Sequence, residues 1–487
     1  MGAGAAQKKL FPLKLTLSFA HYTAVITKKE VTHMKKSIIS IVAAALAMTV
    51  LAAGFYALPA FVNIEDSESA VTVEGVTLVS DNTVTITETA VTVAEGNETA
   101  LECEASGGLT ITESGTYTVT GSVSEGFIKV KKGVTGVTII LKDLDLTSST
   151  TAPIVIGKGA EVTIIITGTV TLTDAETDTA SEDYEGACIK VKSGASLVIR
   201  GDGTLNLDAA SAKNGVKGAA DASVTVTGAV TVNVAAANNG IASDGSVTIA
   251  GGTVNVNAGN DGITSNPDTG EGTVTITGGS LTVVAADDAI KSTGAVTIGM
   301  EGEDDPTILV AGSHEGIEAA SVELLSGSVT LYADDDGINC ADGSLKNSGA
   351  ALTIAGGSLT VYSDGDGIDS NGNITITGGS AVVFGAANGE NAAFDCDGEA
   401  TLTGGSILLI GMNNMAQQPD GVTIEFSGVP VRAGMTVTIK DAYKNTVATV
   451  EAVKTADSVI FTSDSLTSGE VYTLYLDGTA VLRATAK

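Results

Sequence analysis

A three-residue phrase recurs along the middle of the chain at a nearly constant interval. It consists of an acidic residue or Asn, then Gly or Ala, then a branched apolar residue. The copies start at Asn214, Asn239, Asp261, Asp288, Glu315, Asp336 and Asp366, with a mean step of about 25 residues. Such a period is typical of a solenoid, in which each repeat forms one coil and equivalent residues form rows along the stack. A chain built this way has few other folds open to it.

Two short alternating segments joined by glycines lie between the phrases. Residues 247–256, 274–283, 352–361 and 374–383 alternate branched apolar residues with mostly polar ones around a glycine pair. This alternation indicates half-buried strands, and the glycines supply a sharp corner. With a third short strand at the phrase, each repeat makes one coil of a parallel β-helix, about 4.8 Å from the next. We therefore expect an all-β protein, a solenoid of about a dozen coils.

The edges of the repeat predict the domain boundaries. Weaker coils at 137–146, 162–172 and 197–207 extend the pattern upstream, and 400–410 is expected to be the last coil. We predict a β-helix domain over 96–410, preceded by a spacer over 61–95. Residues 411–487 are predicted to be a linker and a small β-rich cap, because an uncovered last coil is an aggregation-prone edge.

The N-terminal region predicts export. Residues 34–60 read as a signal peptide, since Met34-Lys35-Lys36-Ser37 precedes the apolar run 38–51. Residues 1–33 are interpreted as an upstream over-read or an extension. Gly54 stands where a lipoprotein signal needs Cys, so lipidation is unsupported. The predicted location is secreted or cell-surface, with the N-terminus either cleaved or retained as an anchor.

The charge limits the partners. The net charge is −32, and residues 1–60 hold seven Lys against Glu30, so the remainder carries −38 (−32 minus +6). Such a field repels nucleic acid and anionic surfaces and favours cations. We expect no nucleic-acid partner, no membrane contact beyond an N-terminal anchor, and a monomer. A second interpretation is that the acidity simply keeps an extracellular protein soluble.

The four cysteines, at 103, 188, 340 and 396, show no CxxC spacing. Neither a zinc site nor a redox motif is therefore indicated. Cys340 and Cys396 fall in one column with the coil of Ser370 between them, which places them about 9–10 Å apart, too far for a disulfide. We expect free thiols in small core positions.

Alignment of the coils on the core Ile gives a row of outward residues that changes from basic to acidic. The row is Lys190, Lys217, Ala242, Thr264, Lys291, Glu318, Asn339, Asp369 and Asp395. The phrase residues just before the Ile form a second, mostly acidic row.

Carboxylates stacked at this spacing repel one another unless a cation lies between them, and Ca²⁺ prefers six to eight hard oxygen ligands. The alternative is that Asp and Asn occur there because they suit tight turns. The segments 334–337 and 364–371 are the densest. The predicted calcium ligands are Asp261, Asp287, Asp288, Glu315, Asp334, Asp335, Asp336, Asp364, Asp366 and Asp369.

Other chemistries have weaker support. Outward threonines at 225, 248, 275, 297, 353 and 375 would suit a flat cellulose- or ice-binding face, but Thr also simply suits a solvated strand. His314 is isolated, and there is no Ser/His/Asp set, so nucleophilic and metal-hydrolase chemistry lack candidates.

The order of the motifs resembles a known family. The motifs are 115–122 (GTYTVTGS), 201–205 (GDGTL), the Asp-Gly-Ile and Thr-Gly-Gly-Ser units through Ile410, and 469–474 (GEVYTL). Over about residues 100–487 this resembles the secreted β-helix carbohydrate-binding domains of anaerobic bacteria. The resemblance implies a calcium-bearing, right-handed parallel β-helix, similar in fold to pectate lyases, that binds plant cell-wall polysaccharide.

Binding without cleavage is the predicted function, with two alternatives. A pectate lyase needs Ca²⁺ and a basic side chain. Lys291 is the best-placed base and Lys217 the second, but neighbouring carboxylates raise a lysine pKa and disfavour that role. The chain has no Trp for sugar stacking, which leaves tyrosines as the aromatic candidates. We expect pectic or cellulosic glycan to contact Lys217, Lys291, Tyr332 and Tyr362. The third possibility is a surface adhesin or spacer rigidified by calcium.

Overall fold

The structure is a computed structural model. It describes residues 108–209, 213–300, 302, 304–342 and 349–487, and the backbone of four earlier strands. The chain forms two compact units, residues 1–77 and 78–487. In the first, β1 (Leu15–Phe19) and β2 (Tyr22–Ile26) pair as an antiparallel hairpin. The predicted signal peptide, 34–60, lies outside the described residues. Within the described part of the chain, no helix has the length and apolar character needed to cross a membrane.

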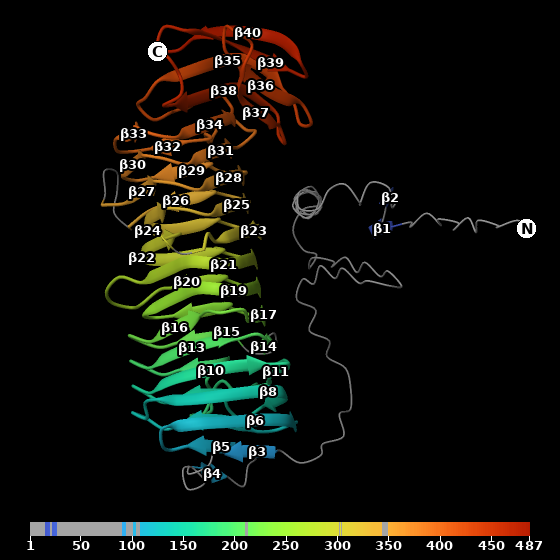
Figure 1. Cartoon of the computed structure of the whole chain (residues 1–487), viewed down its shortest axis with the longest axis vertical. Coiled ribbons are helices and arrows are strands. Elements are labelled where there is room, and N and C mark those ends of the chain that lie inside the picture. Colours follow the sequence, from blue (N-terminus) through green and yellow to red (C-terminus); the bar gives the residue numbers. More distant parts are fainter. Residues whose placement is uncertain are drawn as a thin grey trace, which may run out of the picture. The chain divides into compact units, whose positions relative to one another are not determined.

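The second unit is a parallel β-solenoid of about eleven turns, as predicted from the period (Figure 1). Each coil contributes to three faces, which we call the charged, threonine and aromatic faces after their outward residues. The strands of the charged face are β5 (Gly108–Ile111), β7 (Phe127–Val130), β9 (Ile154–Ile156), β12 (Ala187–Val191), β15 (Asn214–Gly218), β18 (Ile241–Ser243), β20 (Ile263–Ser265), β22 (Ile290–Ile298), β24 (Ile317–Leu324), β26 (Ile338–Cys340), β29 (Ile368–Ser370) and β32 (Asp395–Cys396).

The other two faces share several long strands that bend round a corner. The threonine face consists of β6 (Gly115–Val123), β8 (Val137–Ser148), β10 (Glu161–Thr167), β13 (Ser196–Gly201), β16 (Ser223–Val226), β19 (Ser246–Ala258), β21 (Thr273–Ala285), the ends of β22 and β24, β27 (Ala351–Ile354), β30 (Asn373–Ile376) and β33 (Ala400–Leu402). The aromatic face consists of the ends of β8, β19 and β21 with β11 (Thr169–Asp174), β14 (Thr204–Ala209), β17 (Thr231–Ala236), β23 (Thr307–Ser313), β25 (Ser328–Ala333), β28 (Ser358–Ser363), β31 (Ser380–Phe384) and β34 (Ser406–Gly411).

The recurring phrase has a steric basis. Its branched residues stack as a buried ladder, each at most 2% exposed: Ile241, Ile263, Ile290, Ile317, Ile338 and Ile368. The small residue before each Ile lies against the neighbouring coil. A Cβ added to Gly337 would lie 2.1 Å from Val361 Cγ1 and 2.5 Å from the carbonyl oxygen of Gly367. Larger side chains are excluded there because the coils stack so closely.

Short antiparallel strands cover the first coil. β3 (Ala90–Val93) pairs with β6, and β4 (Leu101–Cys103) pairs with β5. β3 lies at the C-terminal end of the range 61–95, which was predicted to be a spacer. The alternating Ala-Val-Thr-Val of residues 90–93 suits a strand that satisfies the open edge of β6.

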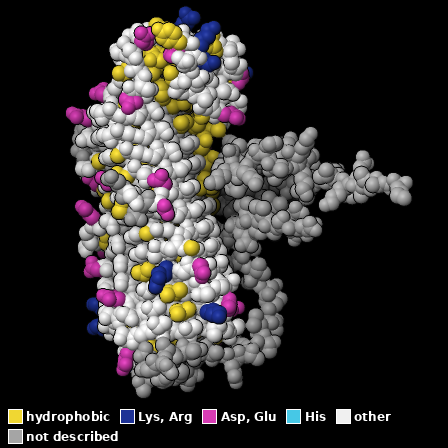
Figure 2. All heavy atoms as spheres, in the orientation of Figure 1, with side chains coloured by type: hydrophobic (Ala, Val, Ile, Leu, Met, Phe, Trp, Pro, Cys, Tyr) yellow, Lys and Arg dark blue, Asp and Glu magenta, His cyan; other side chains and the backbone are white. Residues whose placement is uncertain are grey.

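The C-terminal cap is β-rich, as predicted. β38 (Ala456–Ser463) pairs antiparallel with both β34 and β35 (Thr423–Val431), which closes the last coil. A separate four-stranded antiparallel sheet consists of β36 (Thr436–Lys440), β37 (Thr446–Glu451), β39 (Val471–Leu476) and β40 (Thr479–Thr485). Hydrophobic side chains gather where the cap meets the upper coils (Figure 2).

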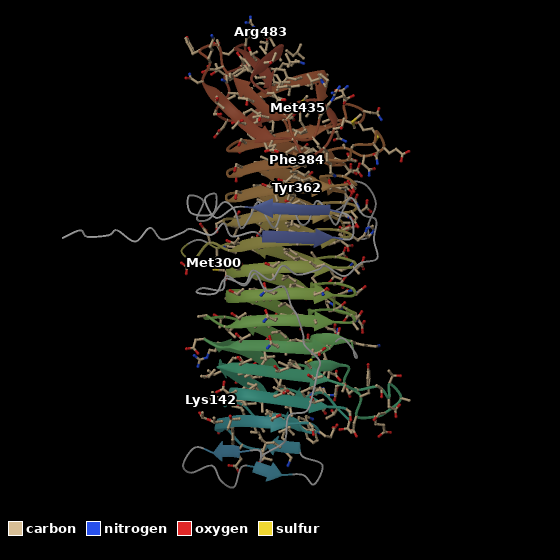
Figure 3. The ribbon with its side chains drawn as sticks, turned by 90° about the vertical axis from the view of Figure 1, so that its right-hand side faces the viewer. Lys142, Met300, Tyr362, Phe384, Met435 and Arg483 are labelled. Carbon is tan, nitrogen blue, oxygen red and sulfur yellow. The ribbon has the colours of Figure 1, made fainter. Side chains whose placement is uncertain are left out.

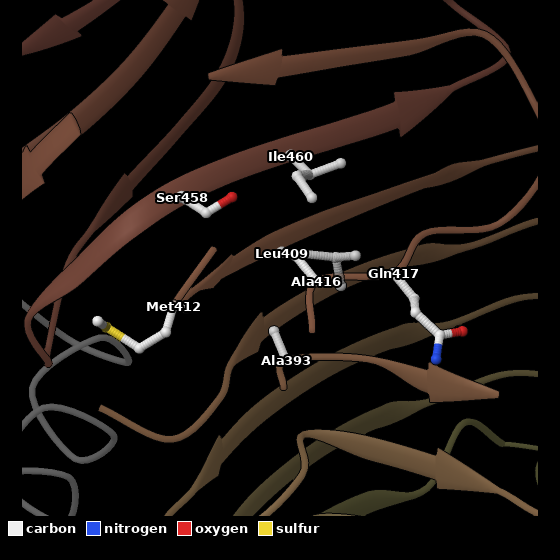
Figure 4. A pocket seen from close by; sticks show the side chains of 8 residues that line it. Ala393, Leu409, Met412, Ala416, Gln417, Ser458 and Ile460 are labelled. Carbon is white, nitrogen blue, oxygen red and sulfur yellow. The ribbon is translucent and has the colours of Figure 1, made fainter. Parts of the chain in front are cut away.

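A small cavity lies at the seam between the last coils and the cap (Figure 4). Ala393, Leu409, Met412, Ser458 and Ile460 are among its lining residues. The buried hydroxyl of Ser458 has no hydrogen-bond partner among the described residues. The cavity is mostly apolar and is lined by residues of the cap and the last coils, so it belongs to the packing of this junction.

The cysteines agree with the sequence interpretation where their side chains are described. Cys188, Cys340 and Cys396 are free thiols. Ser370 pairs in register with Cys340 on one side and Cys396 on the other, which confirms the intervening coil. The side chain of Cys103 lies outside the described residues.

Candidate functional site

The charged face carries the predicted row in unbroken register. Lys190 pairs with Lys217, which pairs with Ala242, and the pairing continues through Thr264, Lys291, Glu318, Asn339, Asp369 and Asp395. Successive members lie one coil apart, about 4.8 Å. The face therefore presents a basic end toward the N-terminus and an acidic end toward the C-terminus.

Six charged side chains meet in the middle of this face. We call Asp261, Asp287, Asp288, Lys291, Glu315 and Glu318 the central cluster. Two carboxylate triads share Asp288: Asp261, Asp287 and Asp288, and then Asp288, Glu315 and Glu318. Within each triad one oxygen from every carboxylate lies within 4.8 Å of the others. Four of these carboxylates were predicted as calcium ligands on the basis of the sequence.

Lys291 occupies the centre of the second triad. Its ammonium donates to Asp288 Oδ2 at 2.5 Å and also to Glu318 Oε2. Burial alone would lower the pKa of Lys291, but the hydrogen bonds and charges of Asp288 and Glu318 outweigh burial and raise it above its usual value. The lysine is therefore a firmly protonated counter-cation within the cluster.

Three oxygens in the central cluster and the neighbouring Thr264 are buried without a hydrogen-bond partner among the described residues. Asp261 and Asp288 are 5% and 2% exposed. Among the described residues, Asp261 Oδ1, Thr264 Oγ1 and Glu315 Oε2 have no hydrogen-bond partner. A buried oxygen without a donor is costly, and a cation would satisfy it.

The pKa values respond to the same burial. Burial raises the pKa of Asp261 to about 6, partly opposed by the charge of Lys291. Burial also raises the pKa of Asp288 to about 8, and the neighbouring Glu318, which has a lowered pKa, adds to this effect. Burial raises the pKa of Glu315, opposed by the amide of Asn339, which donates to Glu315 Oε1.

These residues fit a hard divalent cation. Carboxylate oxygens from three neighbouring coils, with a threonine hydroxyl nearby, are the donor set that Ca²⁺ prefers. Asp261, Asp287 and Asp288 would hold one ion. An ion between Asp288, Glu315 and Glu318 would have to displace the ammonium of Lys291, because that ammonium contacts two of the three carboxylates.

The acidic segments that looked densest in the sequence are arranged differently. Asp334, Asp335, Asp336, Asp364, Asp366 and Asp369 form the downstream cluster, and within the described chain they make no close triad of carboxylates. Asp336 Oδ1 accepts from the backbone N–H of Asp366 at 2.7 Å, and Asp366 Oδ1 accepts from that of Ala392 at 2.5 Å. These two carboxylates link one coil to the next.

Other members of the downstream cluster have side-chain partners. Asp364 pairs with Lys454 of the cap at 2.6 Å, and Asp335 lies 3.6 Å from the imidazole of His314. Burial raises the pKa of Asp336 to about 7 and those of Asp334 and Asp369 to about 6, with neighbouring aspartates adding to each shift. These aspartates therefore make contacts between coils, with the cap and with His314.

The tyrosines do not form a sugar-stacking platform. Tyr332 stacks on Tyr362, and Tyr362 on Phe384, with ring centroids 4.5 and 5.2 Å apart. Tyr362 and Phe384 lie one above the other near the cap (Figure 3). Tyr332 is 3% exposed, Phe384 is fully buried, and Tyr362 packs against the apolar cluster of the cap. Of the two tyrosines predicted to contact glycan, Tyr332 is buried, and Tyr362 is partly buried between neighbouring rings and the cap.

The threonine face is interrupted. Thr225, Thr248, Thr275 and Thr297 are in register, but Glu323 follows Thr297 before Thr353 and Thr375 continue the row. A charged residue within the row departs from the flat neutral surface that a crystalline ligand would need.

Sequence reasoning missed two participants. Glu318 was placed in the row after the Ile but not among the metal ligands, although its position beside Lys291 signalled a contact. Lys217 was predicted to contact glycan, and its ammonium pairs with Asp244 at 2.7 Å. Asp244 lies in a corner between faces, where the repeat alignment gave no expectation.

A family model described as "Carbohydrate-binding domain-containing protein" matches residues 105–351 and 303–472. The chain belongs to this family. The resemblance inferred from the motifs is thereby confirmed, and the carbohydrate-binding family makes a polysaccharide the expected partner. A solved structure, the polysaccharide lyase-like protein from C. thermocellum in a gadolinium derivative, is 33% identical over 45% of this chain and 87% of that chain, with a TM-score of 0.38. The comparison with curated proteins gave no match.

Proposed function

We propose that this protein is an exported, monomeric, calcium-dependent module that binds plant cell-wall polysaccharide, pectic or cellulosic, without cleaving it. One observation supports the calcium part of the proposal. The central cluster contains two carboxylate triads that share Asp288, and its buried oxygens Asp261 Oδ1 and Glu315 Oε2 have no hydrogen-bond partner among the described residues. Family membership supports the carbohydrate part.

Calcium also reconciles the charge of the protein with an acidic ligand. A chain of net charge −32 repels a uronate polymer unless a cation lies between the two sets of carboxylates. An ion held by the buried Asp261 and Asp288 and the half-buried Asp287 would need open coordination positions on the side of Asp287 for a sugar carboxylate or hydroxyl.

The alternative of a pectate-lyase-like enzyme with Lys291 as its base has less support. The base must be neutral to take the sugar proton, and ion pairs with Asp288 and Glu318 raise the pKa of Lys291. The spacer or adhesin alternative is separated from the proposal by experiment.

The test is titration of polygalacturonate and cellulose oligomers onto the full chain in Ca²⁺ and then in EDTA, while absorbance reports unsaturated product. The proposal expects binding that is lost in EDTA, with no rise in absorbance. A rise that Lys291→Ala abolishes would establish the lyase. Stabilisation by calcium without affinity for either glycan would favour the spacer.

A further inference from the structure

The basic end of the charged face contains two lysines on neighbouring coils. Lys190 on β12 and Lys217 on β15 are register partners, so their backbones lie about 4.8 Å apart and both side chains point outward. Like charges on adjacent strands destabilise a sheet unless something compensates them. In a protein with 57 acidic and 25 basic residues, this pairing is unusual.

The surrounding carboxylates compensate only part of this charge. Lys217 pairs with Asp244 at 2.7 Å, and Lys192 pairs with Glu185. These are the two carboxylates that act on Lys190, and both are already committed to other lysines. No hydrogen bond or ion pair within the described residues reaches Nζ of Lys190.

Lys190 is also partly withdrawn from water. Its side chain is half-buried, and burial lowers its pKa, with the charges of Lys192 and Lys217 lowering it further against the opposing effect of Glu185 and Asp244. A desolvated ammonium without a counter-ion is destabilised, and an anion that reaches it recovers part of that free energy. The three lysines and two carboxylates leave one positive charge here.

We propose that Lys190, with Lys217 beside it, binds a carboxylate of an acidic polysaccharide directly, without a metal ion. This inference rests on the proposed function and adds to it a ligand class, uronate-bearing glycan, and a second contact point distinct from the central cluster.

The position of Lys190 and Lys217, the lysine dyad, on the charged face suits an extended polymer. Lys190 and Lys291 are separated by four coil steps along the row, about 19 Å. Between Lys217 and Lys291 the row contains only Ala242 and Thr264, which are 1% and 2% exposed and so do not project from the face. An acidic chain that follows the row meets an ammonium at one end and the cation-binding carboxylates at the other.

The test compares Lys190 with a lysine that already has a partner. Lys190→Gln, Lys190→Arg and the control Lys192→Gln are made in the full chain. Each is titrated in Ca²⁺ with a polygalacturonate oligomer and with its methyl ester, and Ca²⁺ affinity is measured separately. Lys190→Gln should lower the affinity for the acidic oligomer about tenfold and leave the affinities for the ester and for Ca²⁺ unchanged. Lys190→Arg should retain the affinity for the acidic oligomer. Lys192→Gln should change each affinity less than about twofold.

Equal weakening of ester and acid, or no weakening, would overturn the proposal while leaving the proposed function intact. A second measurement is independent of polymer affinity: acetylation of Lys190 by acetic anhydride near pH 7, followed by mass spectrometry, with and without trigalacturonate. Protection of Lys190 and not Lys192 supports the dyad even if the calcium-dependent binding fails. Absence of both protection and polymer binding would reject the dyad and the proposed function together.

Discussion

The central and downstream clusters contain similar residues but differ in what their oxygens contact. In the central cluster, carboxylates face one another and Lys291, and Asp261 Oδ1 has no donor among the described residues. In the downstream cluster, Asp336 and Asp366 each accept a backbone N–H from the following coil. Acidic density in the sequence therefore does not by itself identify a cation site, because the same residues also hold coils together.

The largest expected effect concerns calcium affinity. Asp288→Asn removes the carboxylate shared by both triads while keeping its shape, so Ca²⁺ affinity should fall about 100-fold, or about 2.7 kcal/mol. Asp336→Asn should leave it within about twofold. Calorimetric titration of Ca²⁺ into each full-length variant makes this comparison. A loss as large in Asp336→Asn as in Asp288→Asn would erase the distinction between the clusters.

The second effect concerns stability without metal. Asp336→Ala removes a charged acceptor from the N–H of Asp366 and should cost about 1.5–3 kcal/mol, whereas Asp336→Asn keeps an acceptor oxygen and should cost less than about 1 kcal/mol. Urea unfolding in EDTA measures both. Asp335→Ala, which removes a partly exposed side chain, is the matched control. If the Ala and Asn variants unfold at the same urea concentration, the proposed link between coils is wrong.

The third effect concerns pH. The folded-state pKa of Asp336 is raised to about 7 and that of Asp288 to about 8, so the folded protein binds these protons more tightly than the unfolded chain does. In EDTA, their contribution to stability is complete below about pH 4 and is lost as pH rises through 7 to 8. We expect the urea midpoint in EDTA to fall from pH 5 to pH 8, because both groups release their protons in this window.

The proposed calcium binding should reverse the sign of this pH dependence at the central cluster only. Ions bind deprotonated Asp288, so the increase in thermal midpoint caused by Ca²⁺ should grow from pH 5 to 8. Asp336→Asn should retain that growth, and Asp288→Asn should lose it. Thermal melts of the three proteins in Ca²⁺ and EDTA at four pH values test this, and a pH-independent calcium increment in the wild type would contradict it.

The fold was largely predictable because the period encodes it directly. A residue such as Gly337 has to be small and Ile338 has to be apolar in every coil, so the constraint recurs where the sequence can show it. The row from Lys190 to Asp395 followed from alignment on that Ile, since parallel strands in register carry sequence order into spatial order.

The site was less predictable because contacts across coils depend on where each oxygen points. The sequence shows three aspartates at 334–336, but it does not show that Asp336 Oδ1 accepts a hydrogen bond from the backbone N–H of Asp366. It places Tyr332 and Tyr362 on neighbouring coils but not the cap that packs against Tyr362. Glu318 was not predicted as part of the site, because it contacts Lys291 on the preceding coil.

Stacking of independent coils also has an evolutionary consequence. Duplication or deletion of one coil would leave the Ile ladder continuous and change the length of the solenoid by about 4.8 Å. The same event adds or removes one member of the charged row, which alters the spacing between Lys190 and the central cluster in a single step. A change in coil number can therefore match the protein to polymers with a different distance between their charges, while its hydrophobic interior stays the same.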